Sequence, residues 1–167
     1  MRLAILTVSD AGARGERDDT SGDAIVEWAE GRGYEIVVRQ LVSDDVVQIV
    51  TKLTTWADLG TVDLILTTGG TGLSPRDVTP EATRAVLERE APGIAERLRA
   101  LSLTTFPRAA LSRGMSGTRG GTLIVNLPGS PNGVRDSLAA LDPIVDHAVA
   151  ILTASATDHP SPAASHR

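Results

Sequence analysis

The sequence predicts an α/β fold, a mostly parallel β-sheet with helices on both faces in three α/β/α layers. Four short runs rich in Val, Ile and Leu have the composition of parallel strands covered on both faces, which are apolar along their whole length. Helical patterns separate these runs, and strands that alternate with helices indicate parallel pairing with right-handed crossovers. The predicted strands are residues 3–9, 35–42, 62–68 and 122–129.

Two helices are predicted between the first three strands. We expect Thr20 or Ser21 to cap the first helix, which ends at Gly31 or Gly33. We expect Ser43 to cap the second, which ends at Gly60. Each has an apolar face with helical spacing, formed by Ile25, Val26, Trp28 and Ala29 in the first and by Val46, Ile49, Val50, Leu53 and Trp56 in the second.

The second half of the chain predicts a longer helical region, a hairpin and a closing helix. Thr79 precedes Pro80 and is the expected N-cap of the helical region, which is interrupted at Pro92-Gly93. A short β-hairpin near 113–127 turns at Arg119-Gly120-Gly121. Residues 131–153 predict one helix, or a pair divided near Asp142-Pro143. We therefore expect one domain, residues 1–153, and a disordered tail at 154–167 that is small, polar and Pro-containing.

Composition argues against several classes of protein. The 167 residues carry a net charge of −5 and contain four aromatic side chains, so neither a basic footprint nor base-stacking surfaces for nucleic acid are expected. The absence of cysteine excludes disulfides, thiolate metal sites and cysteine nucleophiles. The three histidines have no ligand spacing. No run approaches 18 uninterrupted apolar residues, so we expect no membrane span and a cytoplasmic protein.

The most unusual segment is the loop that follows the third predicted strand, "GGTGLSPRDV". Ligands of open α/β sheets bind outside the carboxyl ends of the strands. Glycines there let backbone N–H groups approach an anion, although a tight turn with positive φ would also explain them. The chain's one lysine, Lys52, lies elsewhere, so this is not a Walker A loop. The candidate phosphate-binding residues are Thr68, Gly69, Gly70, Thr71, Gly72 and Ser74.

Carboxylates at the same edge suggest where a metal-assisted reaction would occur. Because Thr79 is the better cap, Asp77 has no capping role, and its oxygens suit Mg²⁺ shared with substrate phosphates. Asp44 and Asp45 follow the second strand, where acids also favour a helix N-terminus, so a capping role is equally expected for them. The loop after the first strand adds the candidates Ser9, Asp10 and Asp19.

Taken together, these motifs resemble the MogA/MoaB family of molybdenum cofactor biosynthesis proteins. The matching stretches are "VSDAGARGERDDTSG", "LVSDD", "TTGGTGLSPRDVTPEAT", "LSRG" and "LIVNLPGSPNG", in the family's order, and they cover residues 3 to about 150. The resemblance implies an α/β fold, usually assembled as a trimer or as a hexamer of two trimers. It also implies binding of molybdopterin, a pterin with a dithiolene and a terminal phosphate.

The resemblance further implies a reaction and the residues that carry it. Catalytic members transfer AMP from ATP to the molybdopterin phosphate with Mg²⁺ and release pyrophosphate. Carried onto this chain, Asp77 would be the acid needed for transfer, and Asp44, rather than Asp45, its counterpart; both would share the Mg²⁺ with the phosphates. A downstream molybdate-inserting enzyme is the implied partner. The pterin side would be lined by Ser112, Arg113, Pro128, Gly129, Ser130 and Pro131.

One departure from the family keeps a second function open. Adenylyltransferase members often carry a lysine just after the "LPG" turn, where this chain has Asn132; Arg113, Arg119 or Arg135 are candidates to replace its charge. The alternative to the enzyme is a non-catalytic molybdopterin-binding carrier of the same pathway.

Overall fold

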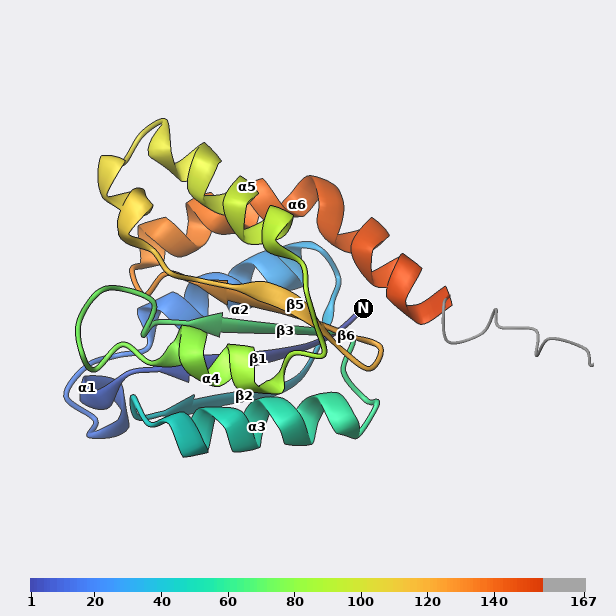
Figure 1. The fold of residues 1–167 in the computed structure, drawn as a ribbon, viewed down its shortest axis with the longest axis horizontal. Coiled ribbons are helices and arrows are strands. Elements are labelled where there is room, and N and C mark those ends of the chain that lie inside the picture. Colours follow the sequence, from blue (N-terminus) through green and yellow to red (C-terminus); the bar gives the residue numbers. More distant parts are fainter. Residues whose placement is uncertain (155–167) are drawn as a thin grey trace, which may run out of the picture.

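The computed structural model describes residues 1–154 and has one six-stranded sheet with helices on both faces (Figure 1). The strand order is β2-β1-β3-β6-β5-β4. The first four of these pair in parallel, and β5 and β4 add an antiparallel edge, so the predicted fold class is confirmed. The strands are β1 (Arg2–Val8), β2 (Glu35–Val42), β3 (Leu64–Thr68), β4 (Arg89–Glu90), β5 (Ser116–Arg119) and β6 (Thr122–Leu127).

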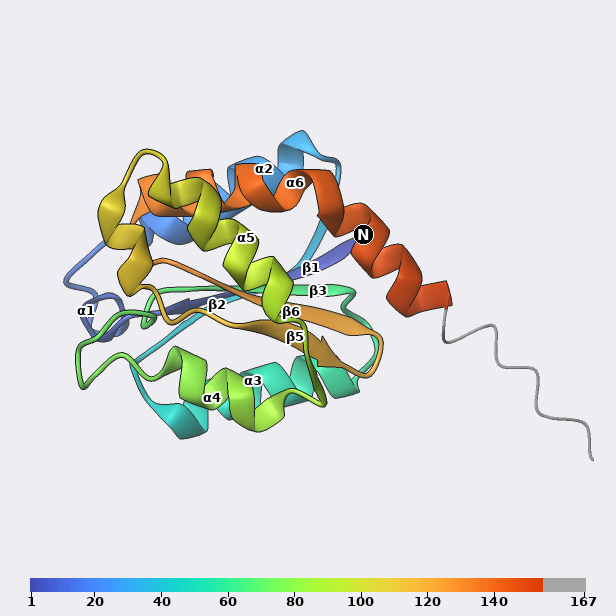
Figure 2. The same cartoon turned by 45° about the horizontal axis from the view of Figure 1, so that its top comes forward.

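The helices form two layers around the sheet (Figure 2). One layer contains α2, α5 and α6, and the other contains α3 and α4. Successive side chains of a strand point to opposite faces, so Leu3 and Ile5 pack in the first core and Ala4 and Leu6 in the second. The helices are α1 (Asp10–Ala13), α2 (Thr20–Gly31), α3 (Val46–Asp58), α4 (Thr79–Val86), α5 (Pro92–Leu103), the 3₁₀ helix η1 (Pro107–Leu111) and α6 (Pro131–Ala154).

The central strands are buried as expected, but β2 is not. It pairs only with β1, and its burial alternates along the strand, leaving Val37 42% exposed. The prediction of a strand buried on both faces was therefore wrong for residues 35–42, because an edge strand needs cover on one face only. On α3, Ile49, Leu53 and Trp56 are buried as predicted, whereas Val46 is 39% exposed at the first turn.

Three of the expected helix caps were also wrong. The side chain of Asp19, not of Thr20 or Ser21, caps α2 by accepting from Gly22 N at 2.9 Å. Asp45 caps α3 by accepting from Gln48 N at 2.8 Å, in place of Ser43. The third is Thr79, which lies inside α4 and donates its hydroxyl to the carbonyl oxygen of Gly69 at 2.9 Å. For α2 and α3, a nearby carboxylate oxygen takes the role, whereas α4 has Pro80 in its first turn and no side-chain hydrogen bond at its N-cap.

The second half of the chain contains less continuous helix than its sequence pattern predicts. The helical region ends at Val86, short of the expected break at Pro92-Gly93, and the two residues of β4 separate α4 from α5. The predicted hairpin is present, with Arg119 opposite Thr122 and Gly120 at φ +53°. The predicted tail lies, from residue 155 on, outside the described residues.

The closing segment is one helix, α6, with Pro143 inside it, and not a divided pair. By length and composition, α6 is the one helix of residues 1–154 that could cross a membrane. Core helices meet the same criterion, and Val134, Leu138 and Leu141 of α6 are buried in the core that it shares with α2 and α5.

Candidate active site

The loops after β1, β3 and β6 meet backbone to backbone at the carboxyl edge of the sheet. Gly69 has φ +94°, and a Cβ atom there would lie 2.2 Å from the carbonyl oxygen of Val8. A Cβ atom on Gly129 would lie 3.1 Å from the Cα atom of Gly69. Thr68 joins the same two loops by donating its hydroxyl to the Pro128 carbonyl at 2.7 Å. Glycine is therefore required here for close approach as well as for a turn.

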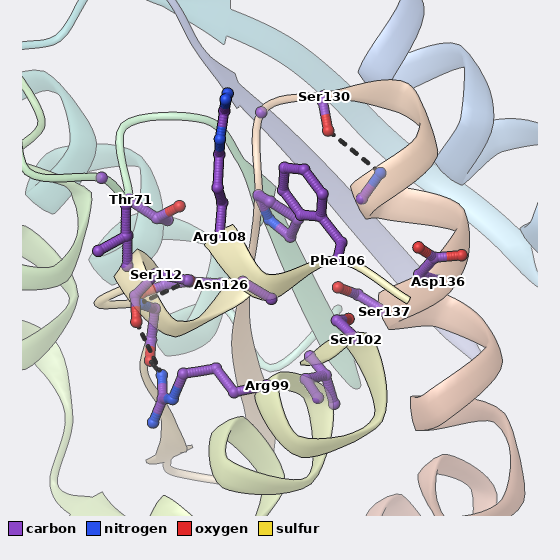
Figure 3. A pocket seen from close by; sticks show the side chains of 18 of the residues that line it. Thr71, Arg99, Ser102, Phe106, Arg108, Ser112, Asn126, Ser130, Asp136 and Ser137 are labelled. Atoms are coloured by element: carbon purple, nitrogen blue, oxygen red, sulfur yellow. Dashed lines mark hydrogen bonds between the residues drawn. The ribbon is translucent and has the colours of Figure 1, made fainter. Parts of the chain in front are cut away.

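A cavity of about 860 Å³ opens beside these loops (Figure 3). One wall is formed by the loops after β3 and β6, and the opposite wall by α5, η1 and the segment that follows η1. This volume is typical of protein pockets that bind small molecules. Of the residues expected at the site, those that line the cavity are Gly70, Thr71, Gly72, Asp77, Ser112, Pro128, Gly129, Ser130 and Pro131.

The glycine loop lies between two carboxylates. Gly70 has φ +64°, and a Cβ atom there would lie 3.1 Å from Asp44 Oδ1 and 2.3 Å from the Thr79 hydroxyl. A Cβ atom on Gly72 would lie 2.8 Å from Asp77 Oδ2. Asp44 and Asp77, which are 33 positions apart in the sequence, are thus both adjacent to the short loop 70–72.

Each of these carboxylates is held by a backbone N–H group. Asp77 Oδ2 accepts from Ser74 N at 3.0 Å within its own loop. Asp44 Oδ2 accepts from Asp10 N at 2.8 Å. Burial raises the pKa of Asp44, and the negative charges of Asp10 and Asp77 raise it further, against the opposing effect of the Asp10 N–H. A cation or a metal ion beside Asp44 would relieve this repulsion.

The loop after β1 contains the three other site candidates, Ser9, Asp10 and Asp19. The pKa of Asp10 is lowered, first by the hydrogen bond from Asp44 N and then by Arg76. Ser9 caps α1 by accepting from Gly12 N at 3.1 Å. The carboxylate of Asp19 accepts from Thr7, from Gly22 N and from Arg39, so its oxygens are used within the protein. Of these three candidates, the structure brings Asp10 into contact with Asp44.

Arg113 does not line the cavity but lies behind the glycine loop. Its Nε donates to the carbonyl oxygen of Gly72 and its Nη2 to that of Asp77, both at 2.7 Å, and it pairs with Glu81. The side chain therefore holds both ends of the segment that presents Asp77. The other two arginines considered as replacements for a lysine are also paired elsewhere, Arg119 with Asp58 and Arg135 with Glu27.

The donor chemistry of the site fits a hard divalent cation that is shared with a ligand. Within residues 1–154, no group of three or more His, Cys, Asp or Glu side chains is arranged to hold a metal ion. Asp44 and Asp77 would supply one carboxylate each, and phosphate oxygens would complete the shell, as is usual for Mg²⁺.

Sequence reasoning missed several residues of the cavity. Asn126 is buried in β6, where its amide nitrogen donates to Thr67 and Thr83 and its oxygen accepts from Met115 N. A polar residue inside the apolar run "LIVNLPG" was the available signal. Phe106 and Arg108 also line the cavity, at the start of the short 3₁₀ helix η1, which is too short to show a periodic apolar pattern in the sequence.

A mostly parallel sheet covered by helices, with a glycine loop and a cavity at the carboxyl edge of its strands, is the architecture of open α/β proteins, which bind their ligands at that edge. The chain belongs to the molybdenum cofactor biosynthesis family described as "Probable molybdopterin binding domain", which matches residues 4–147. The resemblance expected from the motifs is confirmed.

Individual relatives agree with this assignment. A structure of the molybdopterin biosynthesis enzyme MoaB from Thermus thermophilus is 54% identical, with a TM-score of 0.87, over 92% of this chain and 96% of that one. The molybdopterin adenylyltransferase of Helicobacter pylori J99 is 36% identical over 91% of this chain and 88% of that protein. The Drosophila melanogaster molybdenum cofactor synthesis protein cinnamon is 40% identical over 90% of this chain, which spans 25% of cinnamon's length.

Proposed function

We propose that the protein is a molybdopterin adenylyltransferase. It transfers AMP from ATP to the terminal phosphate of molybdopterin and releases pyrophosphate. The observation that carries the proposal is the glycine loop at Gly70–Gly72, with Asp44 and Asp77 beside it and a cavity of about 860 Å³ next to it. Relatives of similar length support it, since the Helicobacter pylori protein that bears this name aligns over most of both chains.

The reaction needs positioning and charge neutralisation more than proton transfer. A phosphate oxygen of molybdopterin forms a bond to the α-phosphorus of ATP, and the bond from that phosphorus to the pyrophosphate oxygen breaks. The attacking phosphate is already ionised at neutral pH, so no strong general base is required. In-line alignment and compensation of the negative charge then account for most of the rate. The absence of cysteine from the chain does not conflict with this chemistry.

Different residues bind the nucleotide phosphates, the metal ion and the pterin. Backbone N–H groups of Gly70, Thr71 and Gly72, which line the cavity, approach the nucleotide phosphates, whereas Gly69 N already donates to the carbonyl oxygen of Leu127 at 3.3 Å. Asp44 and Asp77 would hold Mg²⁺, which would supply charge neutralisation for the phosphates. Ser112 and the turn from Pro128 to Pro131 line the pterin side of the cavity.

Arg108 is the cation that we assign to the substrate in this cavity. The other lining arginine, Arg99, donates to the carbonyl oxygens of Ser112 and Gly114, at 3.3 and 2.8 Å. The Arg108 side chain makes no hydrogen bond or ion pair within residues 1–154, and Figure 3 shows it extending from η1 between the labelled residues Thr71 and Ser130. This charge compensates for the neutral Asn132, which also lines the cavity.

We also propose a cytoplasmic homotrimer, or a hexamer of two such trimers, that passes its product to a molybdate-inserting enzyme. These assignments rest on the family. Light scattering on the purified protein tests the assembly, and a mass near one chain, 17.4 kDa, would contradict it.

The decisive experiment measures pyrophosphate release under anaerobic conditions from Mg²⁺-ATP, with and without molybdopterin. We expect release that requires molybdopterin and is lost in Asp77→Asn, while that variant still binds the pterin. Asp18→Asn is the matched control, because it makes the same change of charge at an exposed position outside the cavity. Pterin binding without release from the wild-type protein would instead identify the carrier, and Asn132→Lys would be the first variant to make.

A further inference from the structure

Resting on the proposed function, we propose that the ion pair between Arg76 and Asp10 is a positioning device for the catalytic carboxylate of Asp44. Three loops meet at this point because β1 lies between β2 and β3 in the sheet. Asp10 follows β1, Asp44 follows β2, and Arg76 belongs to the loop after β3. Asp10 is therefore placed to link the other two loops.

Asp10 and Asp44 are joined by a reciprocal pair of hydrogen bonds. The backbone N–H of Asp10 donates to Asp44 Oδ2 at 2.8 Å, and the backbone N–H of Asp44 donates to Asp10 Oδ1 at 3.0 Å. Each residue thus fixes the other's carboxylate against its own backbone. Because each carboxylate accepts a hydrogen bond from the backbone N–H of the other residue, rotation of either side chain breaks one of the two hydrogen bonds.

Arg76 completes the arrangement on the other side of Asp10. Its Nε donates to Asp10 Oδ2 at 3.0 Å, and its Nη2 lies 3.0 and 2.8 Å from the two oxygens. This planar fork holds a carboxylate in one orientation, which a lysine could not do. The positive charge also offsets the repulsion between Asp10 and Asp44.

The same arginine is also the sequence neighbour of Asp77, the second proposed catalytic carboxylate. Arg76 immediately precedes Asp77, so the ion pair ties the loop that carries Asp77 to the residue that orients Asp44. This contact therefore helps to set the separation of the two carboxylates, together with the bonds from Arg113 to the loop of Asp77. A shift of about 1 Å in a reacting group can lower a rate roughly 100-fold, so this separation matters for transfer.

A purely stabilising role does not account for the arrangement. The Arg76 side chain is 66% exposed and that of Asp10 is 28% exposed, and ion pairs open to solvent on one side contribute about 1 kcal/mol or less. The pair between Arg14 and Glu16, in the neighbouring loop, has an arginine of similar exposure, 59%, with a Glu16 side chain that is 56% exposed, and it contacts neither carboxylate. It is therefore a matched control for the loss of a surface ion pair.

The test compares Arg76→Gln, Asp10→Asn and the double variant with Arg14→Gln. For both single variants, we expect kcat to fall by about 10- to 100-fold, while KM for molybdopterin stays within about twofold. Because both substitutions remove the same ion pair, the double variant should lose no more than the worse single variant. Arg14→Gln should keep the wild-type kcat, and all variants should unfold within a few degrees of the wild type.

An unchanged kcat in Arg76→Gln, or losses that multiply in the double variant, would overturn the proposal. A crystal structure of Arg76→Gln gives a readout that does not depend on activity. We expect the Asp44 carboxylate to leave hydrogen-bonding distance of Asp10 N, and an unmoved carboxylate would also overturn the proposal. If the wild-type protein proves inactive, the proposed function fails, while this structural comparison still decides the positioning role.

Discussion

Asp44 and Asp45 are adjacent in the sequence, but their carboxylates bind to different parts of the molecule. Asp45 turns to its own helix and accepts from Gln48 N at 2.8 Å as the N-cap of α3. Asp44 turns across the sheet edge and accepts from Asp10 N at 2.8 Å. The structure thereby gives the two adjacent acids different partners, which is consistent with the choice of Asp44 for the proposed site.

The two acids should respond differently to substitution. Asp45→Ala should lower the free energy of unfolding by about 1 kcal/mol through loss of the cap and leave turnover unchanged. Asp44→Asn should abolish most pyrophosphate release and change stability little. Thermal unfolding and steady-state kinetics on both variants check this. An inactive Asp45→Ala beside an active Asp44→Asn would reverse the assignment.

Gly69 should not tolerate a side chain. Its φ is +94°, and a Cβ atom would meet the Val8 carbonyl oxygen at 2.2 Å, so Gly69→Ala combines backbone strain with a clash against backbone. We expect a loss of about 3 kcal/mol or more in chemical denaturation. Gly15→Ala is the control, because φ is +70° there but the space is open. It should cost about 1 kcal/mol, and an equal cost at both positions would argue against the close approach.

Arg108 should affect substrate binding and not folding. Arg108→Ala removes a cavity-lining cation whose side chain has no partner among residues 1–154, so we expect KM for molybdopterin to rise by about tenfold, as for the loss of one charge-assisted hydrogen bond. Separate titrations of ATP and molybdopterin will show which substrate the arginine binds. Arg89→Ala, at an exposed position on β4, should leave both KM values unchanged. A KM for molybdopterin that does not move in Arg108→Ala would remove Arg108 from the site.

The single tyrosine allows a direct test of pH dependence away from the site. Burial raises the pKa of Tyr34 to about 12, and the hydrogen bond to Asp146 acts in the same direction. A folded-state pKa above the unfolded value of about 10 stabilises the protein below pH 10. This contribution is lost as the pH rises from 10 through 12. Ultraviolet titration should show tyrosinate forming near pH 12.

Two variants separate the causes of the Tyr34 shift. Asp146→Asn should lower the pKa of Tyr34, because a carboxylate that accepts the phenol proton favours the neutral form. Tyr34→Phe should remove the tyrosine's contribution to the loss of stability above pH 10, as measured by denaturation at several pH values. Ionisation of Tyr34 near pH 10 in the folded wild-type protein would contradict the burial argument.

Regular elements were predictable where local pattern and tertiary environment agree. Strands β1, β3 and β6 are buried on both faces, so their apolar runs identify them within two residues. Strand β2 has a similar composition, but its place at the edge of the sheet leaves Val37 exposed. The two residues of β4 exist only because β5 lies beside them, and no local pattern could reveal them.

By itself, the sequence determined the fold class, the order of the central strands along the chain and the loops from which a site could be built. These follow from local hydrophobic periodicity, from glycine spacing and from the rule that ligands bind at the carboxyl ends of parallel strands. The identity of the family was also contained in the motifs, and the comparisons confirmed it.

Only the tertiary structure decided which side chains act together. It separated Asp44 from Asp45, placed Arg113 behind the glycine loop and brought Arg108 into the cavity. The physical reason is that hydrogen-bonding partners are chosen by distance and angle. Residues 10, 44 and 76 lie far apart in the sequence and become neighbours because β1 lies between β2 and β3.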